Sequence, residues 1–243
     1  LPPALLFTGL RGTGKTSSAR ILAKSIRCTN AKDFVPCNTC DNCIAITAGN
    51  SVDVIEIDGA SNNGVDAIRD LRESVMFMPS SGQYKIIIID EVHMLSTSAF
   101  NALLKTLEEP PAHVIFMMAT TEAHKIPQTI LSRCQRFDFR RISVKQLTDH
   151  LKHICQLENI KADEKALWQI AQQGDGSARD SITLLDQVIN FSKGELSEKT
   201  VTEILGLTDR SLIFEVFENL VHRKPEKIVD SLEKLAVVAT NPS

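Results

Sequence analysis

Short runs of apolar residues recur through the first part of the chain and alternate with longer stretches of mixed polarity. The clearest runs are Ala4–Thr8, Val54–Ile57, Ile86–Ile89 and Val114–Ala119, and a weaker one follows at Gln135–Phe139. Continuous apolar runs of this length are typical of strands buried on both faces, and crossover helices between such strands give a parallel sheet. The pattern therefore predicts an α/β domain over residues 1–142.

After Phe139 the apolar spacing changes from that of strands to that of helices. One face of each of three helices is marked by Leu147, Leu151, Ile154 and Leu157; by Ala166, Leu167 and Ile170; and by Ile182, Leu185 and Ile189. Asp163 suits the cap of the second helix, and Ser177 with Asp180 resembles a capping box before the third. Further helices are expected from Ser197, Asp209 and Pro225. We predict a small helical domain over 143–206 and the start of another helical element over 207–243.

The apolar runs and the N-terminal segment bear on two classes of protein. The longest apolar run, Val114–Ala119, is far shorter than the roughly 20 residues that cross a bilayer, so a membrane protein is not expected. No basic leader precedes the first strand, which gives no support for secretion, and the abrupt start suggests a chain trimmed at its N-terminus.

Charge limits the contacts that the chain can make with polyanions. The net charge is −3, whereas a protein that coats nucleic acid by charge alone is strongly basic. Residues 1–142 carry 15 Lys and Arg against 14 Asp and Glu, and residues 143–243 carry 12 against 16. Any contact with a polyanion is therefore local, and the first domain is the better candidate.

Four of the six cysteines are clustered, at Cys28, Cys37, Cys40 and Cys43. In a chain without a secretory signal this clustering indicates a metal site in a reducing compartment, and four thiolates close a tetrahedral zinc shell. With no histidine or water position evident, the site is interpreted as structural. A redox pair or free thiols are the alternatives. The other two, Cys134 and Cys155, are expected to be buried as small hydrophobic residues.

The segment Gly9–Thr16 matches the phosphate-loop pattern G-x-x-x-x-G-K-[ST] between a strand and a helical stretch. Glycines let backbone N–H groups surround phosphate oxygens at a helix N-terminus. Lys15 supplies a point charge between the β- and γ-phosphates, and Thr16 can bind Mg²⁺. A glycine-rich turn with a chance lysine is the alternative, and the order of strand, loop and helix favours a nucleotide site.

Two acids follow the apolar run Ile86–Ile89. Asp90 is expected near the metal, and Glu91 is placed to polarise a water for attack on the γ-phosphate. The alternative is that both acids are simply solvated at the end of a strand. The intact phosphate loop in the same chain makes this alternative the weaker interpretation. The pair indicates hydrolysis as well as binding.

Two threonines and two arginines are further candidates. Thr120 and Thr121 end a strand where a hydroxyl can orient the attacking water. Arg133 lies at the end of a short helix, and Arg179 lies early in the helix that begins after Ser177. From spacing alone, strand-end threonines and solvated arginines are the better interpretation.

Several segments together carry a resemblance to a known family. Besides the phosphate loop and the four-cysteine insert they are DVIEIDGASNNGVDAIRDLR from Asp53, IDEVHML from Ile89, NALLKTLEEPP from Asn101 and SRC from Ser132. In these segments the chain resembles the gamma/tau subunits of bacterial DNA polymerase III clamp loaders, which are AAA+ ATPases. The SRC triplet is typical of clamp loaders. The four-cysteine insert restricts the resemblance to two kinds of clamp loader subunit, gamma/tau and delta-prime. Of these two, the intact phosphate loop favours gamma/tau.

The resemblance implies a role for each matching residue. Lys15 and Thr16 would bind the phosphates of ATP and Mg²⁺, Asp90 would organise the metal, and Glu91 would be the catalytic base. Thr121, with Thr120 as its neighbour, best matches sensor 1. Arg133 would be an arginine finger that acts on the ATP of an adjacent subunit, and Arg179 would be sensor 2. The other nucleotide-binding positions would be Gly9, Arg11, Gly12, Thr13, Gly14 and Ser17.

The family likeness also implies an architecture and partners. We expect a five-stranded AAA+ core with a zinc insert at 28–43, a three-helix lid and a truncated collar. In a cytoplasmic complex with other gamma/tau copies, delta and delta-prime subunits, ATP binding would open the sliding clamp (beta), and hydrolysis would release it on primed DNA. Lys105 and Thr129 are possible DNA contacts, whereas Asn62 and Gly64 stand where some relatives carry basic residues.

Two other functions are compatible with the motifs. One is a different AAA+ motor, such as a helicase loader or branch-migration ATPase, whose hydrolysis a clamp would not stimulate. The other is a scaffold without hydrolysis that holds partners through its zinc module and collar.

Overall fold

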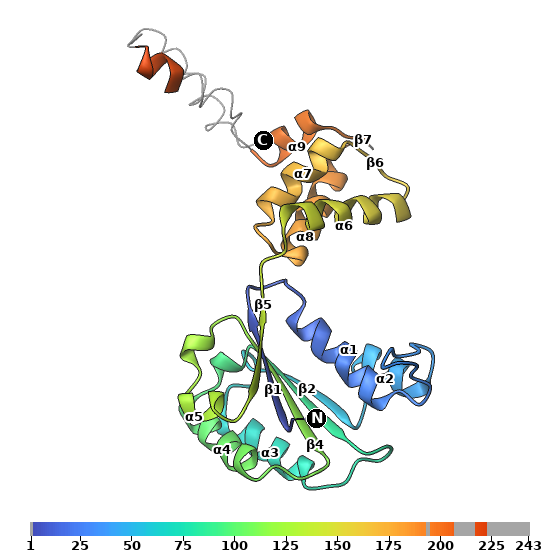
Figure 1. Ribbon diagram of the computed structural model, residues 1–243, viewed down its shortest axis with the longest axis vertical. Coiled ribbons are helices and arrows are strands. Elements are labelled where there is room, and N and C mark those ends of the chain that lie inside the picture. Colours follow the sequence, from blue (N-terminus) through green and yellow to red (C-terminus); the bar gives the residue numbers. More distant parts are fainter. Residues whose placement is uncertain (1, 193–194, 207–216, 223–243) are drawn as a thin grey trace. The chain divides into compact units, whose positions relative to one another are not determined.

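The computed structural model describes residues 2–192, 195–206 and 217–222 (Figure 1). The chain divides into two compact units, Leu1–Arg141 and Ile142–Ser243. The helical element expected over 207–243 lies outside the described residues, apart from a short helical stretch at 217–221. In the part of the chain that the structure describes, no helix is both long and apolar enough to cross a membrane.

The first unit is built on the predicted five-stranded parallel sheet. Its strands are β1 (Ala4–Gly9), β2 (Val54–Asp58), β3 (Lys85–Asp90), β4 (Val114–Thr120) and β5 (Gln135–Phe139). They pair in the order β2-β3-β4-β1-β5, every pair parallel, so all five carboxyl ends lie at one edge of the sheet.

Helices cover both faces of this sheet, which is why its central strands are apolar without alternation (Figure 1). On β3, Ile87 and Ile89 pack into one core, and Ile86 and Ile88 pack into the other. The first core is closed by α3 (Val65–Val75), α4 (Thr97–Glu108) and α5 (Gln128–Leu131), and the second by α1 (Lys15–Arg27) and α2 (Asp41–Ala48).

Strand β5 gave the weakest sequence signal because it is more exposed than β2, the strand at the other edge of the sheet. It pairs with β1 alone, and most of its residues are exposed. At its end it lies close to Gly9, where an added Cβ atom would collide with the carbonyl oxygen of Phe139. Gly9 also has a φ of +147°, so only glycine fits where β1 leads into the phosphate loop.

A buried ion pair that the sequence did not predict joins the end of α1 to the start of β2. Arg27 Nη2 lies 2.6 Å from Asp53 Oδ2, and each side chain is only 3% exposed. Arg27 also donates to the carbonyl oxygens of Ser81 and Tyr84, and Asp53 accepts from the backbone N–H of Ser80. Because Cys28 is the next residue after Arg27, this network also fixes the position of the backbone at the first cysteine of the cluster.

The second unit has its own apolar core. Its elements are α6 (Val144–Leu157), β6 (Lys161–Ala162), α7 (Glu164–Gln173), α8 (Ala178–Phe191), β7 (Glu195–Leu196) and α9 (Glu198–Ile204). The three predicted helices are present, and Leu151, Leu167, Leu185 and Val201 from four helices meet in the core. The short parallel pair β6–β7 was not expected.

Two predicted core positions are wrong, and one predicted cap is only partly confirmed. Leu157 is 66% exposed and Ile182 37% exposed, because the buried faces run through Cys155 on α6 and through Ser181 on α8. Asp163 occupies the N-cap of α7, but its side chain makes no capping hydrogen bond. Ser177 is confirmed as the cap of α8, since its hydroxyl accepts the N–H of Asp180 at 3.2 Å, which is one half of the predicted capping box.

Candidate functional site

The phosphate loop turns from β1 into α1 on residues with left-handed backbone. Gly12 and Gly14 have φ values of 73° and 94°, which glycine adopts without strain. Gly14 is the N-cap of α1, and among the described residues no side chain caps this helix. The N-terminus of α1 is therefore open to an anion.

Lys15 is folded back over this loop. Its Nζ donates to the carbonyl oxygens of Gly9 and Leu10 at 3.1 and 3.0 Å, and the residue is 5% exposed. Thr13 braces the loop through a 2.8 Å hydrogen bond to the same Leu10 carbonyl. Of the other predicted nucleotide-binding positions, Arg11 and Ser17 are exposed.

The two predicted Mg²⁺ ligands lie together although they are 74 positions apart in the chain. Thr16 Oγ1 donates to Asp90 Oδ2 at 2.6 Å. Asp90 is the last residue of β3, and its other oxygen accepts the N–H of Glu91 at 2.9 Å. A hydroxyl and a carboxylate are oxygen ligands that suit Mg²⁺, so the donor set fits this ion.

Glu91 is held at the same edge by Thr121. Its Oε2 accepts hydrogen bonds from Thr121 Oγ1 at 3.1 Å and from Thr121 N–H at 3.3 Å. Thr120 is instead fully buried and contacts His93. The structure thus brings Thr121, and not its neighbour, to the expected base.

Sequence reasoning missed a charged pair beside this site. Arg20 on α1 forms two hydrogen bonds with Glu56 on β2, at 2.7 and 2.5 Å. These bonds raise the pKa of Arg20, and the charge of Asp90 adds to the effect. No sequence motif joins these positions, because the pair arises only when α1 packs beside β2.

Arg133 lies on the surface at the end of α5. Its Nη2 is 3.0 Å from Glu108 Oε1, and its Nη1 donates to the carbonyl oxygen of Thr129 at 2.8 Å. Thr129 on α5 and Lys105 on α4 are both exposed. The geometry therefore presents Arg133 outwards, held by Glu108.

Arg179 belongs to the second unit, where it lies in the first turn of α8. Its carbonyl oxygen accepts the hydroxyl of Thr183 at 2.9 Å. A nucleotide contact by Arg179 stays a prediction.

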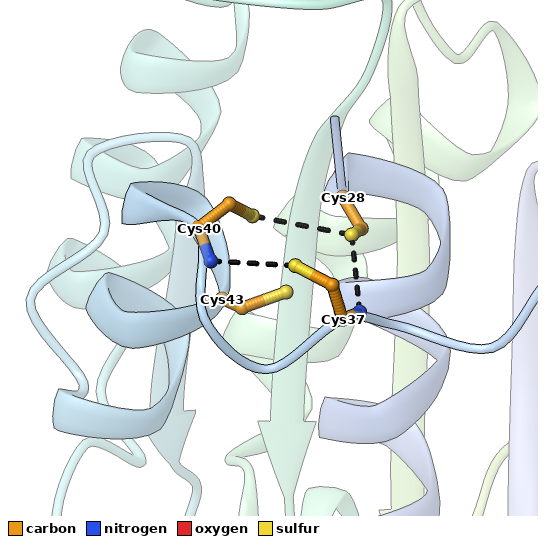
Figure 2. Close-up of side chains that lie close together, drawn as sticks. All are labelled: Cys28, Cys37, Cys40 and Cys43. Carbon is orange, nitrogen blue, oxygen red and sulfur yellow. Dashed lines mark hydrogen bonds between the residues drawn. The ribbon is translucent and has the colours of Figure 1, made fainter. Parts of the chain in front are cut away.

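The four clustered cysteines converge from three segments (Figure 2). Cys28 follows α1, Cys37 lies in the next loop, and Cys40 and Cys43 begin α2. Their sulfurs all lie within 4.8 Å of one another, and those of Cys28 and Cys40 are 3.9 Å apart. Tetrahedral zinc with Zn–S bonds of about 2.3 Å places sulfurs about 3.8 Å apart, so the cluster fits such an ion.

The thiols of the cluster differ in acidity. Hydrogen bonds from the side chain and backbone of Thr39 lower the pKa of Cys37 to about 6, and the backbone N–H of Cys43 lowers the pKa of Cys40. Burial raises the pKa of Cys43 to about 12. Because metals bind the thiolate, a bound cation would favour the deprotonated form of all four sulfurs and release protons on binding.

The two isolated cysteines lie outside this cluster. Cys155 is 3% exposed in the second core, as predicted, and Cys134 is only partly buried. Burial raises the pKa of both thiols.

Comparison with known proteins identifies relatives along almost the whole chain. The family model of the DNA polymerase III delta subunit matches residues 1–143, and that of the ATPase lid domain of the DNA polymerase III clamp loader subunit matches residues 146–194. The tau subunit of DNA polymerase III from Bacillus subtilis is 49% identical over 240 residues, which is 99% of this chain and 43% of that protein.

Two other relatives agree. The tau subunit from Escherichia coli is 44% identical over a match that covers 96% of this chain and 36% of that protein. The gamma subunit from Buchnera aphidicola subsp. Baizongia pistaciae is 43% identical over a match that covers 93% of this chain and 61% of that protein. The chain thus spans less than half the length of these tau relatives.

A solved structure supports the fold. The Holliday junction branch migration motor RuvB of Thermotoga maritima matches with a TM-score of 0.60 and 18% identity, over 91% of this chain and 70% of that one. At this identity the likeness concerns the fold alone, and it confirms the predicted AAA+ architecture of an α/β core followed by a helical domain.

Proposed function

The chain belongs to the gamma/tau family of DNA polymerase III clamp loader subunits, and from this membership we propose that it is an ATP-hydrolysing motor subunit of the bacterial replicative clamp loader. One observation supports hydrolysis most directly: Thr16 contacts Asp90, and Thr121 contacts Glu91, at one edge of the sheet. Ligands of open α/β sheets bind at this edge, outside the carboxyl ends of the strands.

In the proposed mechanism the phosphate loop binds ATP. Lys15 exchanges its two carbonyl partners for the β- and γ-phosphates, and the loop N–H groups surround the phosphate oxygens. Thr16 and Asp90 would hold Mg²⁺, which when bound neutralises charge on the phosphates. The remaining nucleotide-binding positions are Gly9, Arg11, Gly12, Thr13, Gly14, Ser17 and, from the lid, Arg179.

Hydrolysis needs a base, an orienting group and a positive charge. We assign these to Glu91, which takes a proton from the attacking water, to Thr121, and to Arg133 of an adjacent subunit. The outward position of Arg133 supports action on a neighbour, because a finger that acts in trans must be reachable from outside.

The proposed assembly follows the family. Residues 1–142 form the motor core with its cysteine insert at 28–43, residues 143–206 the lid, and residues 207–243 the start of the collar. Other gamma/tau copies, delta and delta-prime subunits, the sliding clamp and primed DNA are the proposed partners. Lys105 and Thr129, exposed on α4 and α5, are the candidate DNA contacts.

Replacing Glu91 by glutamine tests the proposed function. We expect steady-state hydrolysis in the assembled complex to fall at least about 100-fold, while the ATP dissociation constant stays within a few-fold, because the amide cannot accept the proton of the water. Glu73→Gln, on an exposed position of α3, is the matched control and should hydrolyse ATP normally. Unchanged turnover in Glu91→Gln would remove Glu91 from the chemistry.

Metal analysis tests the cysteine cluster. Freshly purified, reduced protein should contain about one zinc per chain, because four sulfurs close the shell. Cys43→Ser should lose most of this zinc, and Cys134→Ser, outside the cluster, should keep it. A zinc content below about half an equivalent in the reduced wild-type protein would exclude a four-thiolate site.

A further inference from the structure

His93 lies between two carboxylates beside the proposed base. It belongs to a single 3₁₀ turn, Val92–Met94, that follows Glu91 directly. Its side chain is 6% exposed, with Nδ1 3.3 Å from Glu91 Oε2 and Nε2 3.1 Å from Glu122 Oε2. Nδ1 is also 3.0 Å from Thr120 Oγ1. A nearly buried imidazole thus touches an acid with each ring nitrogen.

Glu91 needs such a contact to hold one orientation. Its backbone is left-handed, with a φ of 44°, which is unusual for glutamate, and its side chain is 30% exposed. The hydrogen bonds from Thr121 and the contact with His93 are made by the same oxygen, Oε2. In the proposed mechanism the other oxygen of Glu91 accepts the proton of the water.

The far side of the imidazole is fixed in turn. Glu122 Oε2 accepts Lys125 Nζ at 2.8 Å, and this bond lowers the pKa of Glu122, which keeps the carboxylate charged. The backbone N–H of Glu122 donates to Thr120 Oγ1 at 3.0 Å, so the two partners of the ring are also joined. Since an ionised carboxylate only accepts hydrogen bonds, it orients a ring N–H toward itself.

We propose that His93, carrying a proton on each ring nitrogen as ion pairing with two carboxylates requires, is a positioning residue for the ATPase reaction: its Nδ1 edge holds the carboxylate of Glu91, while Glu122 holds the ring through Nε2. The inference rests on the proposed function, because it gives His93 a role only if Glu91 is the base. In this role His93 acts through Glu91 and takes no part in the chemical step itself. Its loss lets Glu91 turn away, and a misplaced base slows the chemical step without weakening ATP binding.

Asparagine and glutamine separate the two edges of the ring. The amide nitrogen of asparagine is separated from Cβ by the same number of bonds as Nδ1 of histidine. The amide nitrogen of glutamine is separated from Cβ by the same number of bonds as Nε2 of histidine. His93→Asn therefore keeps a donor toward Glu91, and His93→Gln keeps a donor toward Glu122. His93→Ala removes both. His113→Ala is the control, because His113 bonds to the carbonyl of Val75 at 3.0 Å, beyond the opposite end of β4.

The experiment measures kcat, KM and ATP affinity of the full-length chain in the assembled complex, with thermal melting for each variant. We expect His93→Ala and His93→Gln to lower kcat about tenfold, His93→Asn to stay within about threefold of wild type, and ATP affinity to be unchanged in all. Should His93→Ala fail to fold, the comparison of asparagine with glutamine still decides.

Two results would overturn the proposal. One is a kcat of wild-type size or higher in both His93→Ala and His93→Gln. The other is a loss in His93→Asn as large as in His93→Gln, which would show that the Nδ1 edge does not matter. Absence of hydrolysis by the wild-type complex would instead contradict the proposed function itself, so the two failures are distinguishable.

Discussion

Replacing Arg133 by alanine is expected to slow ATP hydrolysis by the assembled complex about 1,000-fold while ATP binding stays intact. Arginine fingers stabilise charge that develops only in the transition state, so their loss lowers turnover rather than affinity. In this chain Arg133 is exposed and tethered by Glu108, as a group that serves a neighbouring subunit requires.

The control for Arg133 is a second exposed arginine with an acidic partner. Arg69 on α3 pairs with Asp66 at 3.0 Å and is 61% exposed, so Arg69→Ala removes a comparable ion pair away from the site. Turnover of wild-type and variant chains is compared in the complex and in the isolated chain. An equal loss in the isolated chain would contradict action in trans, because no neighbour is then present.

Replacing Lys15 by alanine is expected to weaken ATP binding about 100-fold or more. The ammonium of Lys15 already lies at the loop, 3.1 and 3.0 Å from two loop carbonyls. Charged hydrogen bonds contribute about 1.5–3 kcal/mol each, and two phosphate contacts are lost together.

Isothermal titration of the Lys15→Ala chain with ATP and Mg²⁺ measures this effect. Lys24→Ala is the control, because Lys24 lies further along the same helix, where its Nζ is 3.3 Å from Asn38 Oδ1. Tight binding by the Lys15→Ala chain would contradict the assignment of Gly9–Thr16 as the phosphate loop.

Much of the fold follows from local patterns. The central strands can be predicted as apolar runs because both of their faces are covered by helices. The residues of Ile86–Ile89 show this, since they pack alternately into the two cores. The signal weakens at Gln135–Phe139 because an edge strand keeps exposed polar residues. Exposed Leu157 and Ile182 show the limit of spacing alone, since Cys155 and Ser181 take the core positions instead.

The motifs also predicted which residues meet at the edge of the sheet, but not how they are held. Thr16 and Asp90, or Glu91 and Thr121, come together because parallel strands end at the same edge. The contacts of His93 with Glu122 and of Arg27 with Asp53 could not be predicted, because neither pair follows a local period or a phosphate-binding pattern. Such contacts depend on side-chain packing between elements.

The most direct test of the central claim is ATP hydrolysis by the full-length chain assembled with its delta-type partners, measured with and without sliding clamp and primed DNA. If the chain is a clamp-loading motor, turnover rises strongly only when both are present, since hydrolysis is then coupled to release of the closed clamp. Turnover that does not respond to clamp and DNA, from a complex that still binds ATP and zinc, would contradict this account and favour a scaffold or a different AAA+ motor.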